Sequence, residues 1–396
     1  MRINHNYLRL SDNYLFSKVA SKTQEFQKLY PQRSIIKLSI GDVSRPLPSV
    51  IVRALRRACT EMGQVKSFHG YGPEIGYLWL RDAVASFYLE QYKVKLANDE
   101  IIISDGAKSD VSNILDIFGA HAKVAMCNPV YPVYLETNLM LGRQVQFFHA
   151  TAENNFLPLP SAELEADIIY LCNPANPTGV CYQREQLQQW VDFARKRGAI
   201  ILYDAAYACF VNAANLPKSI YEIDGATECA IEICSLSKMA GFTGVRCGYT
   251  IIPKQLHWDS VSLNQLWCRR QSTKFNGVSY IVQRGAEAVF TPAGLSAVQK
   301  NIAYYQRNLR LLCRTLKKLG WQYFGGEHAP YVWVRCPEGF NSWQFFDYLL
   351  QAAGIVCTPG VGFGTSGEGY IRLTGFNTYT NTRLACQRLL QLLKNC

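Results

Sequence analysis

Apolar residues occur in short continuous runs between residues 101 and 252, with polar or helix-like segments between the runs. The runs with this composition are Ile101–Ser104, Lys123–Cys127, Gln144–Phe148, Asp167–Cys172, Ala199–Tyr203, Ala230–Cys234 and Arg246–Ile252. Because they are apolar at successive positions, they predict strands buried on both faces of a mostly parallel sheet. Helix-like segments such as Arg184–Arg197 separate several of them, and this alternation predicts an α/β fold.

The C-terminal part has a different pattern. In residues 298–319 apolar side chains recur every three or four positions from Ile302 to Leu319, which predicts a long amphipathic helix that ends at Gly320. Short elements without regular alternation follow, at Tyr331–Arg335, Ser342–Ala353, Tyr370–Leu373 and Asn377–Leu393. They predict a smaller α+β domain.

The N-terminal residues precede the strand–helix pattern, with a helix expected over Tyr14–Leu29 and a strand over Ile35–Ile40. A chain of 396 residues exceeds the usual size of one hydrophobic core, so two domains are expected. The expected division is an N-terminal arm joining the small domain (1–43), a large domain (44–285) and a small C-terminal domain (286–396).

Composition and charge narrow the function. The net charge of +11 is spread along the chain without a helix-turn-helix, RNP or zinc-finger pattern, so nucleic-acid binding is not expected. The 14 cysteines include no C-x-x-C and the six histidines no H-E-x-x-H, so we expect free thiols in a reducing compartment and no metal site. Without an apolar signal core or a run near the ~20 apolar residues of a membrane span, the expected location is cytoplasmic.

A lysine lies directly after a predicted buried strand. The segment is Ser235-Leu-Ser237-Lys238, and Arg246 follows in Gly244-Val-Arg246-Cys-Gly248. Burial there lowers the pKa of a lysine amine toward the free base that condenses with aldehydes. The hydroxyls and the guanidinium suit a phosphate group. A surface loop with unrelated serine and lysine residues is the alternative interpretation.

An aspartate ends another predicted strand. Asp204 follows the apolar run Ile200–Tyr203, at the sheet edge where ligands of open α/β sheets gather, and Tyr207 comes three residues later. A carboxylate at this edge suits a ring nitrogen that must stay protonated, and Tyr207 is placed to hydrogen-bond a ring oxygen. The alternative interpretation of Asp204 is a helix N-cap.

Further polar segments follow other predicted strands. Asn176 lies in the proline-rich turn Asn173–Gly179, and Ser104–Ser109 contains a glycine turn whose backbone N–H groups suit an anion. Tyr131 follows a third strand and suits stacking on a planar ring, or else lies in the core. Arg372, in the small domain, suits bidentate binding of a substrate carboxylate.

These segments, in this order, make the chain similar to the fold-type I aminotransferases over nearly its whole length. The matching pieces are Tyr71…Gly76…Leu80-Arg81, Asn173–Gly179, Asp204…Tyr207, Ser235–Lys238, Gly244…Arg246…Gly248 and Arg372. The resemblance implies a homodimer that holds pyridoxal 5′-phosphate on Lys238, near the subunit boundary. It also implies catalytic roles for Lys238, Asp204 and Tyr207.

Within this family the chain resembles the LL-diaminopimelate aminotransferases, through Gly41–Pro48, Phe68–Glu74, Ser104–Asp110 and Thr273–Val278. This resemblance implies amino transfer between LL-2,6-diaminoheptanedioate and 2-oxoglutarate, giving tetrahydrodipicolinate and glutamate in lysine biosynthesis. It implies the cofactor-binding residues Tyr71, Ala107, Lys108, Tyr131, Asn176, Asp204, Tyr207, Ser235, Ser237, Lys238 and Arg246. It implies the substrate-binding residues Tyr14, Gly41, Glu74, Lys108, Tyr131, Asn176, Asn276 and Arg372, with Glu74 facing the distal ammonium.

Several alternatives remain at this point. Another fold-type I enzyme, such as an aspartate or aromatic aminotransferase or a carbon–sulfur lyase, fits the same segments, and so does a regulatory domain of this fold. Ser235-x-x-Lys238 with Ser11-Asp-Asn13 resembles a serine acyltransferase, but the order is wrong and K-T-G is absent. Gly362-x-Gly364-x-x-Gly367 matches a dinucleotide motif, but a predicted strand follows it, so we expect a flexible loop beside the substrate.

Overall fold

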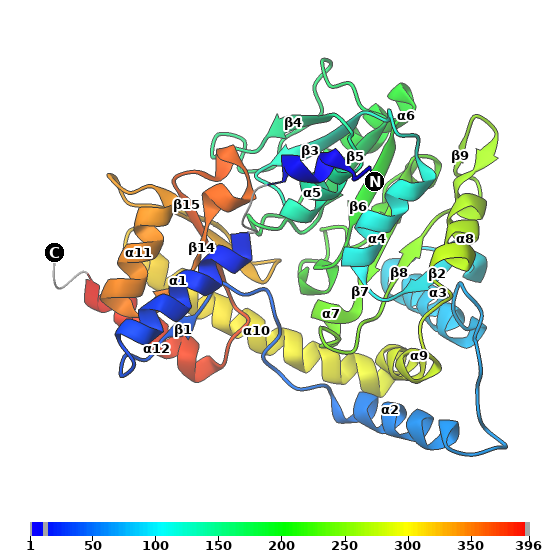
Figure 1. Cartoon of the computed structure of the whole chain (residues 1–396), viewed down its shortest axis with the longest axis horizontal. Coiled ribbons are helices and arrows are strands. Elements are labelled where there is room, and N and C mark those ends of the chain that lie inside the picture. The colour runs from blue at the N-terminus through cyan, green and yellow to red at the C-terminus, as the bar shows by residue number, and fades with distance from the viewer. Residues whose placement is uncertain (1, 11–14, 393–396) are drawn as a thin grey trace.

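A seven-stranded sheet forms the centre of the larger part of the protein, in a computed structural model that describes residues 2–10 and 15–392. The strand order is β2-β8-β7-β6-β5-β3-β4 (Figure 1). Neighbours are parallel except β8, which is antiparallel to β2 and β7, so the prediction of a mostly parallel sheet is confirmed. The strands are β2 (Ile101–Ser104), β3 (Val124–Asn128), β4 (Val145–His149), β5 (Ile168–Cys172), β6 (Ile200–Asp204), β7 (Ala230–Ser235) and β8 (Gly248–Ile251).

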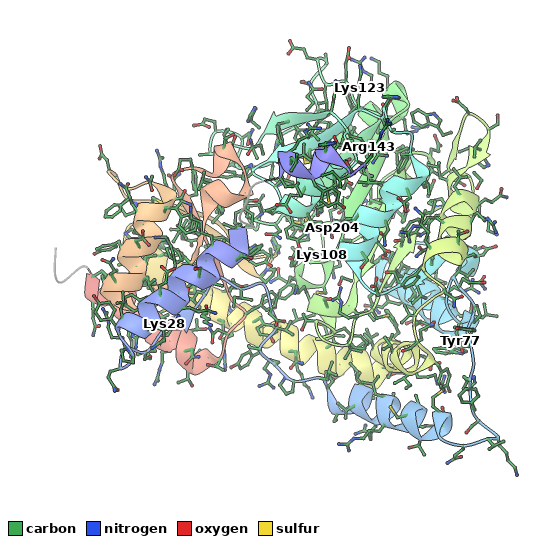
Figure 2. All side chains as sticks on the ribbon, in the orientation of Figure 1. Lys28, Tyr77, Lys108, Lys123, Arg143 and Asp204 are labelled. Carbon is green, nitrogen blue, oxygen red and sulfur yellow. The ribbon has the colours of Figure 1, made fainter. Side chains whose placement is uncertain are left out.

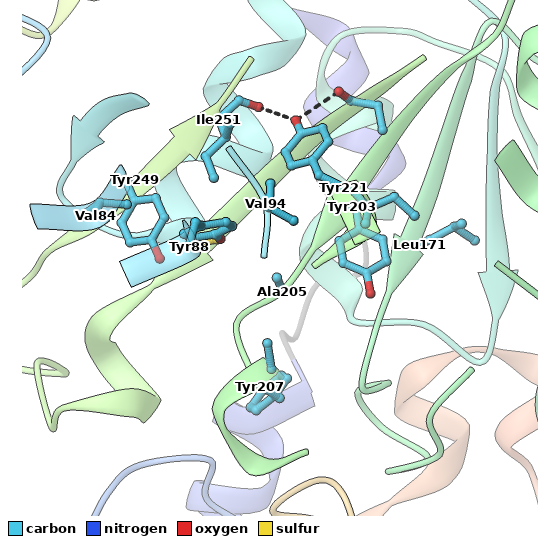
Figure 3. Close-up of a cluster of buried hydrophobic side chains, with 14 of the residues drawn as sticks. Val84, Tyr88, Val94, Leu171, Tyr203, Ala205, Tyr207, Tyr221, Tyr249 and Ile251 are labelled. Atoms are coloured by element: carbon cyan, nitrogen blue, oxygen red, sulfur yellow. Dashed lines mark hydrogen bonds between the residues drawn. The ribbon is translucent and has the colours of Figure 1, made fainter. Parts of the chain in front are cut away.

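Helices cover both faces of this sheet. Successive strand residues point to opposite faces, so Ile201 and Tyr203 enter one hydrophobic cluster while Ile200 and Leu202 enter the other. The first cluster, part of which is drawn in Figure 3, also contains residues of α2 (Ser49–Met62), α3 (Leu78–Tyr92), α6 (Arg184–Arg197) and α9 (Tyr280–Glu287). The second contains residues of α4 (Ala107–Asn113), α5 (Pro132–Met140) and α8 (Leu263–Lys274). Burial on both faces explains why these strands are apolar throughout.

A four-stranded antiparallel sheet forms the second part, in the order β11-β12-β15-β14. Its core also includes the N-terminal helix α1 and the short parallel pair of β1 with β13. The elements are α1 (Leu15–Leu29), β1 (Ile36–Lys37), α10 (Pro292–Lys318), β11 (Tyr323–Gly325), β12 (Tyr331–Arg335), α11 (Ser342–Ala353), β13 (Ile355–Val356), β14 (Thr358–Pro359), β15 (Tyr370–Thr374) and α12 (Tyr379–Leu392).

Helix α10 joins the two parts (Figure 1). Val298 and Ile302 near its start pack in a cluster of the large sheet, whereas Leu309 and Leu316 pack in the core of the small one. The predicted boundaries at residues 43/44 and 285/286 stay a prediction. The shared core of α1 and the small sheet supports the first boundary, whereas Val298 and Ile302 pack with the large part beyond the second.

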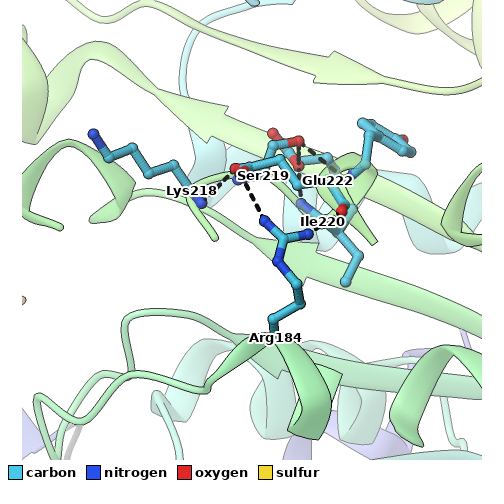
Figure 4. A network of polar contacts seen from close by, with 7 residues as sticks. Arg184, Lys218, Ser219, Ile220 and Glu222 are labelled. Carbon is cyan, nitrogen blue, oxygen red and sulfur yellow. Dashed lines mark hydrogen bonds and ion pairs between the residues drawn. The ribbon is translucent and has the colours of Figure 1, made fainter. Parts of the chain in front are cut away.

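Short elements complete the chain. They are a hairpin of β9 (His257–Trp258) with β10 (Val261–Ser262), the helix α7 (Leu236–Met239), and the 3-10 helices η1 (His5–Arg9), η2 (Asn98–Glu100), η3 (Ile114–Ile117), η4 (Ala208–Phe210), η5 (Ile220–Glu222), η6 (Ala226–Glu228), η7 (Ala288–Phe290), η8 (Gly360–Phe363) and η9 (Thr365–Gly367). Figure 4 shows how η5 is held: Glu222 accepts hydrogen bonds from the backbone N–H groups of Lys218 and Ser219 at 2.7 and 2.9 Å, and Arg184 bonds the Glu222 carbonyl. This network ties the connection before β7 to the start of α6.

Some predicted boundaries differ from the structure. The long helix begins at Pro292 because the Thr291 hydroxyl caps it, accepting from the N–H of Gly294 at 3.1 Å. The strand predicted from Arg246 begins only at Gly248, because Arg246 adopts a left-handed conformation with φ of 68°. The dinucleotide-like glycine segment forms η8 and η9 and leads into β15, not into a helix.

Among the residues described, no helix has the length and apolar composition needed to cross a membrane. The described cysteines are free thiols, as expected from the sequence.

Candidate active site

Two adjoining cavities lie beside the large sheet, and the first of them is also lined by residues of the small part. The first, of about 680 Å³, extends along α1 and is called the α1 cavity here. The second, of about 350 Å³, contains Asp204 in its wall and is called the Asp204 cavity. Both cavities are lined by seven of the predicted site residues, namely Lys108, Tyr131, Asn176, Tyr207, Ser237, Lys238 and Arg246.

The ends of neighbouring strands bring these residues together. Asp204 is the last residue of β6, and it pairs in register with Cys172 at the end of β5 and with Ile233 in β7. Ser235 ends β7 directly before α7, which carries Lys238. Lys108 and Asp204 both lie near the centre of the molecule in Figure 2, where the carboxyl ends of the strands face the small part.

The Lys238 amine lines both cavities. The pKa of Lys238 is lowered to about 8, chiefly by burial, with smaller contributions from the charges of Arg246 and Arg372 and an opposing one from the Asp42 carboxylate. A lysine with this pKa is about one-tenth free base at pH 7, whereas an ordinary lysine is almost wholly protonated, and a nucleophilic amine needs the free base.

Asp204 is a buried carboxylate held by neutral donors. One oxygen accepts from the backbone N–H of Ala206 at 2.9 Å, and the other accepts a short hydrogen bond from the Tyr134 hydroxyl. Burial raises the pKa of Asp204, while these two hydrogen bonds oppose that rise. A cationic group placed in the cavity would therefore stabilise the ionised carboxylate.

The donors predicted for a phosphate lie at one end of the Asp204 cavity. Its lining includes Ala107, Ser235, Ser237 and Arg246, and Arg246 donates to the Ser237 hydroxyl at 3.1 Å. Gly106 makes room for this arginine, because a Cβ there would lie 2.6 Å from Arg246 Nη2. Two hydroxyls and a guanidinium form an appropriate donor set for a phosphate dianion.

Arg372 lines the α1 cavity and has one buried N–H group without an acceptor among the described residues. Its side chain is only 1% exposed, and it donates to Asn176 Oδ1 at 2.6 Å and to the carbonyl of Ser39 at 2.9 Å. No described residue accepts a hydrogen bond from its Nε atom. The aromatic rings of Tyr331 and Phe363 lie 4.2 and 4.8 Å from its Cζ atom. A buried guanidinium with an unused N–H suits an incoming carboxylate.

Tyr207 lies past the end of β6, beyond Ala205 in Figure 3. Its hydroxyl is 3.0 Å from the hydroxyl of Tyr331 and accepts from Asn176 Nδ2 at 3.5 Å. Burial raises the pKa of Tyr207 well above its usual value, so this phenol stays a neutral donor.

The remaining predicted site residues differ in whether they line a cavity. Gly41 lines the α1 cavity. Tyr71, Glu74 and Asn276 line neither cavity and are exposed, Tyr71 to 94%. They lie near one another in the fold, because a Cβ on Gly277 would be 3.4 Å from Glu74 Cα. Tyr14 lies outside the described residues.

The sequence analysis missed several residues of the site. Tyr134, Cys172 and Tyr331 line a cavity, and Tyr134 contacts Asp204 directly. Tyr134 lies in the first turn of α5, three residues after the N-cap Tyr131, and this short separation from a predicted site residue was the available signal. Tyr331 had no such signal, because it comes from a strand of the small sheet.

Comparison with known proteins places these observations in a family. Residues 33–389 match the family described as aminotransferase class I and II. The chain is 48% identical to the LL-diaminopimelate aminotransferase of Lachnospira eligens, over 99% of this chain and 100% of that protein. It is 48% identical to the enzyme of the same name from Prochlorococcus marinus, with 99% and 100% coverage. Its structure superimposes on that of L,L-diaminopimelate aminotransferase from Chlamydomonas reinhardtii with a TM-score of 0.94, at 40% identity and with 99% and 98% coverage.

Proposed function

Because this chain belongs to the class I and II aminotransferases, we propose that it moves an amino group between LL-2,6-diaminoheptanedioate and 2-oxoglutarate, giving tetrahydrodipicolinate and glutamate. Full-length identity of 48% to proteins named LL-diaminopimelate aminotransferase supports this choice within the family. The observation that carries the proposal is that Lys238 and Asp204 line one cavity together with a phosphate-type donor set.

Members of this family depend on pyridoxal 5′-phosphate in general, and the residues of the Asp204 cavity fit that cofactor. A phosphate would meet Ser235, Ser237 and Arg246. A protonated ring nitrogen is the cation that the buried Asp204 carboxylate needs, since its present hydrogen-bond donors are neutral. An aldehyde would meet the Lys238 amine.

The proposed mechanism assigns one task to each residue. When bound, the cofactor supplies an aldehyde for amines and a ring that withdraws electrons from the substrate α-carbon. Lys238 Nζ accepts the proton from that α-carbon, Asp204 keeps the ring nitrogen protonated, and Tyr207 donates to the ring oxygen. Arg372 orients the substrate by binding its α-carboxylate.

The direct test is an assay with the holoenzyme. Mixing it with LL-2,6-diaminoheptanedioate and 2-oxoglutarate is expected to produce glutamate, with ping-pong kinetics because the two substrates use the site in turn. Aspartate, tyrosine and a cysteine thioether serve as competing donors. Faster turnover with aspartate or tyrosine would instead indicate an aspartate or aromatic aminotransferase. Release of ammonia from the thioether would indicate a carbon–sulfur lyase.

The pKa of Lys238 predicts how cofactor loading depends on pH. In the folded protein this pKa is about 8, so the amine is protonated and unreactive below that pH and free above it. The rate at which the apoprotein condenses with pyridoxal 5′-phosphate should rise about tenfold per pH unit below 8 and level off above. Absorbance after stopped-flow mixing measures this rate.

Asp42 supplies the matched control for this profile. Its carboxylate raises the pKa of Lys238, so Asp42→Asn should move the midpoint to lower pH. A rate that stays flat between pH 6 and 9 would remove Lys238 as the titrating group.

We also propose that the enzyme is a homodimer whose sites are completed by Tyr71, Glu74 and Asn276 of the partner. The support is that these residues are exposed and lie outside both cavities of their own chain. Glu74 would then face the distal ammonium of the substrate, since a carboxylate is the complementary group.

Mixed dimers test the shared site. Lys238→Ala subunits and subunits carrying both Tyr71→Ala and Glu74→Ala should each be nearly inactive alone. Mixing and reassociating them should restore about one quarter of the wild-type activity, because half of the dimers then contain one intact site. If the mixture is no more active than the two separate variants added together, Tyr71 and Glu74 either act in the same site as Lys238 of their own chain or act in no site.

A further inference from the structure

Tyr331 lies between two parts of the proposed site that come from different sheets. It is the first residue of β12, is 1% exposed and lines the α1 cavity. Its hydroxyl is 3.0 Å from the Tyr207 hydroxyl, and its ring centroid is 4.2 Å from Cζ of Arg372. On the basis of the function proposed above, we propose that Tyr331 is a positioning residue with two separable tasks: its ring holds the carboxylate-binding Arg372, and its hydroxyl strengthens Tyr207 as a donor to the cofactor.

The ring acts on Arg372 across the small sheet. Strands β12 and β15 pair so that Trp333 lies opposite Arg372, and Tyr331, two residues before Trp333, lies on the same face of the sheet. Phe363 flanks the guanidinium at 4.8 Å, so aromatic surface rather than water surrounds much of this cation. Cation–π contact then favours one orientation of the guanidinium, the one in which Nε has no described acceptor.

The number of hydroxyl protons determines which of the two tyrosines donates the hydrogen bond. A phenol has one proton to donate, and the Tyr207 proton is committed if it meets the cofactor oxygen. The contact at 3.0 Å can then form only if Tyr331 donates to the Tyr207 oxygen. Such a chain polarises Tyr207 and strengthens its own hydrogen bond.

Gly41 shows that the chain keeps space for this hydroxyl. A Cβ on Gly41 would lie 2.5 Å from the Tyr331 hydroxyl oxygen, closer than atoms pack. A side chain at position 41 would therefore displace the Tyr331 hydroxyl from its contact with Tyr207.

Tyr331→Phe tests the hydroxyl in the holoenzyme without any amino donor. Donation to the ring oxygen favours the deprotonated form of the bound chromophore, because that form has more negative charge there. Loss of the Tyr331 hydroxyl should therefore raise the pKa of the chromophore, read from a pH titration of its absorbance, by about 0.5 unit. KM for 2-oxoglutarate should change less than about twofold, because the ring remains next to Arg372.

A double-mutant cycle separates this role from a general effect on folding. In a Tyr207→Phe background, Tyr331→Phe should shift the chromophore pKa by less than about 0.1 unit, because the proposed intermediary is absent. Tyr182→Phe is the matched control: it removes another buried phenol, whose hydroxyl donates to the Pro158 carbonyl at 2.8 Å, and should leave the pKa unchanged. An equal shift in both backgrounds, or no shift in either, would overturn the role of the hydroxyl.

Tyr331→Leu tests the ring. It should reproduce the pKa shift of Tyr331→Phe and, in addition, raise KM for 2-oxoglutarate about tenfold. A KM equal to that of Tyr331→Phe would overturn the role of the ring. The pKa titration requires only bound cofactor, so its result stands even if the enzyme prefers another amino donor, and failure of the substrate assay is thereby distinguished from failure of this inference.

Discussion

Replacing Lys238 by alanine is expected to remove the absorbance band that arises when the cofactor condenses with this amine, and to reduce turnover by on the order of 10⁴-fold or more. Lys238 lines both cavities, and in the proposed mechanism its loss removes both the group that condenses with the aldehyde and the base that takes the α-proton. Phosphate contacts to Ser237 and Arg246 remain, so the variant should still bind pyridoxal 5′-phosphate noncovalently. Absorbance spectra and equilibrium dialysis measure the two effects separately.

Lys108 is the natural control, because it also lines both cavities. Lys108→Ala should keep the visible absorbance even if substrate affinity falls. If the absorbance persists in Lys238→Ala and disappears in Lys108→Ala, the attachment site is Lys108 and the proposed mechanism is wrong.

The sheet and much of the site were predictable because both depend on local sequence. Continuous apolar runs identify the strands, since β5 to β7 are buried on both faces. Parallel strands bring their carboxyl ends to one edge, so polar residues directly after separate runs are expected to meet. Asp204 and Lys238 do meet in this way.

Contacts between distant segments were not predictable in the same way. Tyr134 and Asp204 are 70 residues apart, and Tyr207 and Tyr331 are 124 residues apart. The apolar periodicity of a segment does not specify which distant residue its polar side chains will contact in the folded protein. The turn at Arg246 was missed for a related reason: apolar neighbours continue the strand pattern, while the positive φ of Arg246 breaks it.

Residues predicted from resemblance alone form a third group. Tyr71, Glu74 and Asn276 have no local signal for a site, and in a single chain they are exposed. If the proposed homodimer is correct, their environment is set by a surface of another molecule, which neither strand patterns nor helix periodicity describe.

Arg372→Ala is expected to weaken the binding of every carboxylate substrate. The guanidinium is buried, hydrogen-bonded to Asn176 and to the Ser39 carbonyl, and belongs to a residue that lines the α1 cavity. Removing one partner of such a buried charge pair costs about 2–5 kcal/mol. This predicts a fall in kcat/KM from about 30-fold to several thousand-fold for the amino donor and for 2-oxoglutarate, measured by initial rates.

The loss should depend on the substrate carboxylate and not on general damage to the site. Condensation of the loaded Arg372→Ala enzyme with a primary amine that has no carboxylate should be as fast as in the wild type. Arg335→Ala, which removes an exposed arginine from the same small sheet, should leave kcat/KM unchanged. Arg372→Lys should recover only part of the loss, because an ammonium cannot donate to Asn176, Ser39 and a substrate carboxylate in the planar arrangement of a guanidinium. Unchanged saturation by 2-oxoglutarate in Arg372→Ala would assign carboxylate binding to another cation of the α1 cavity, such as Lys37 or Lys108.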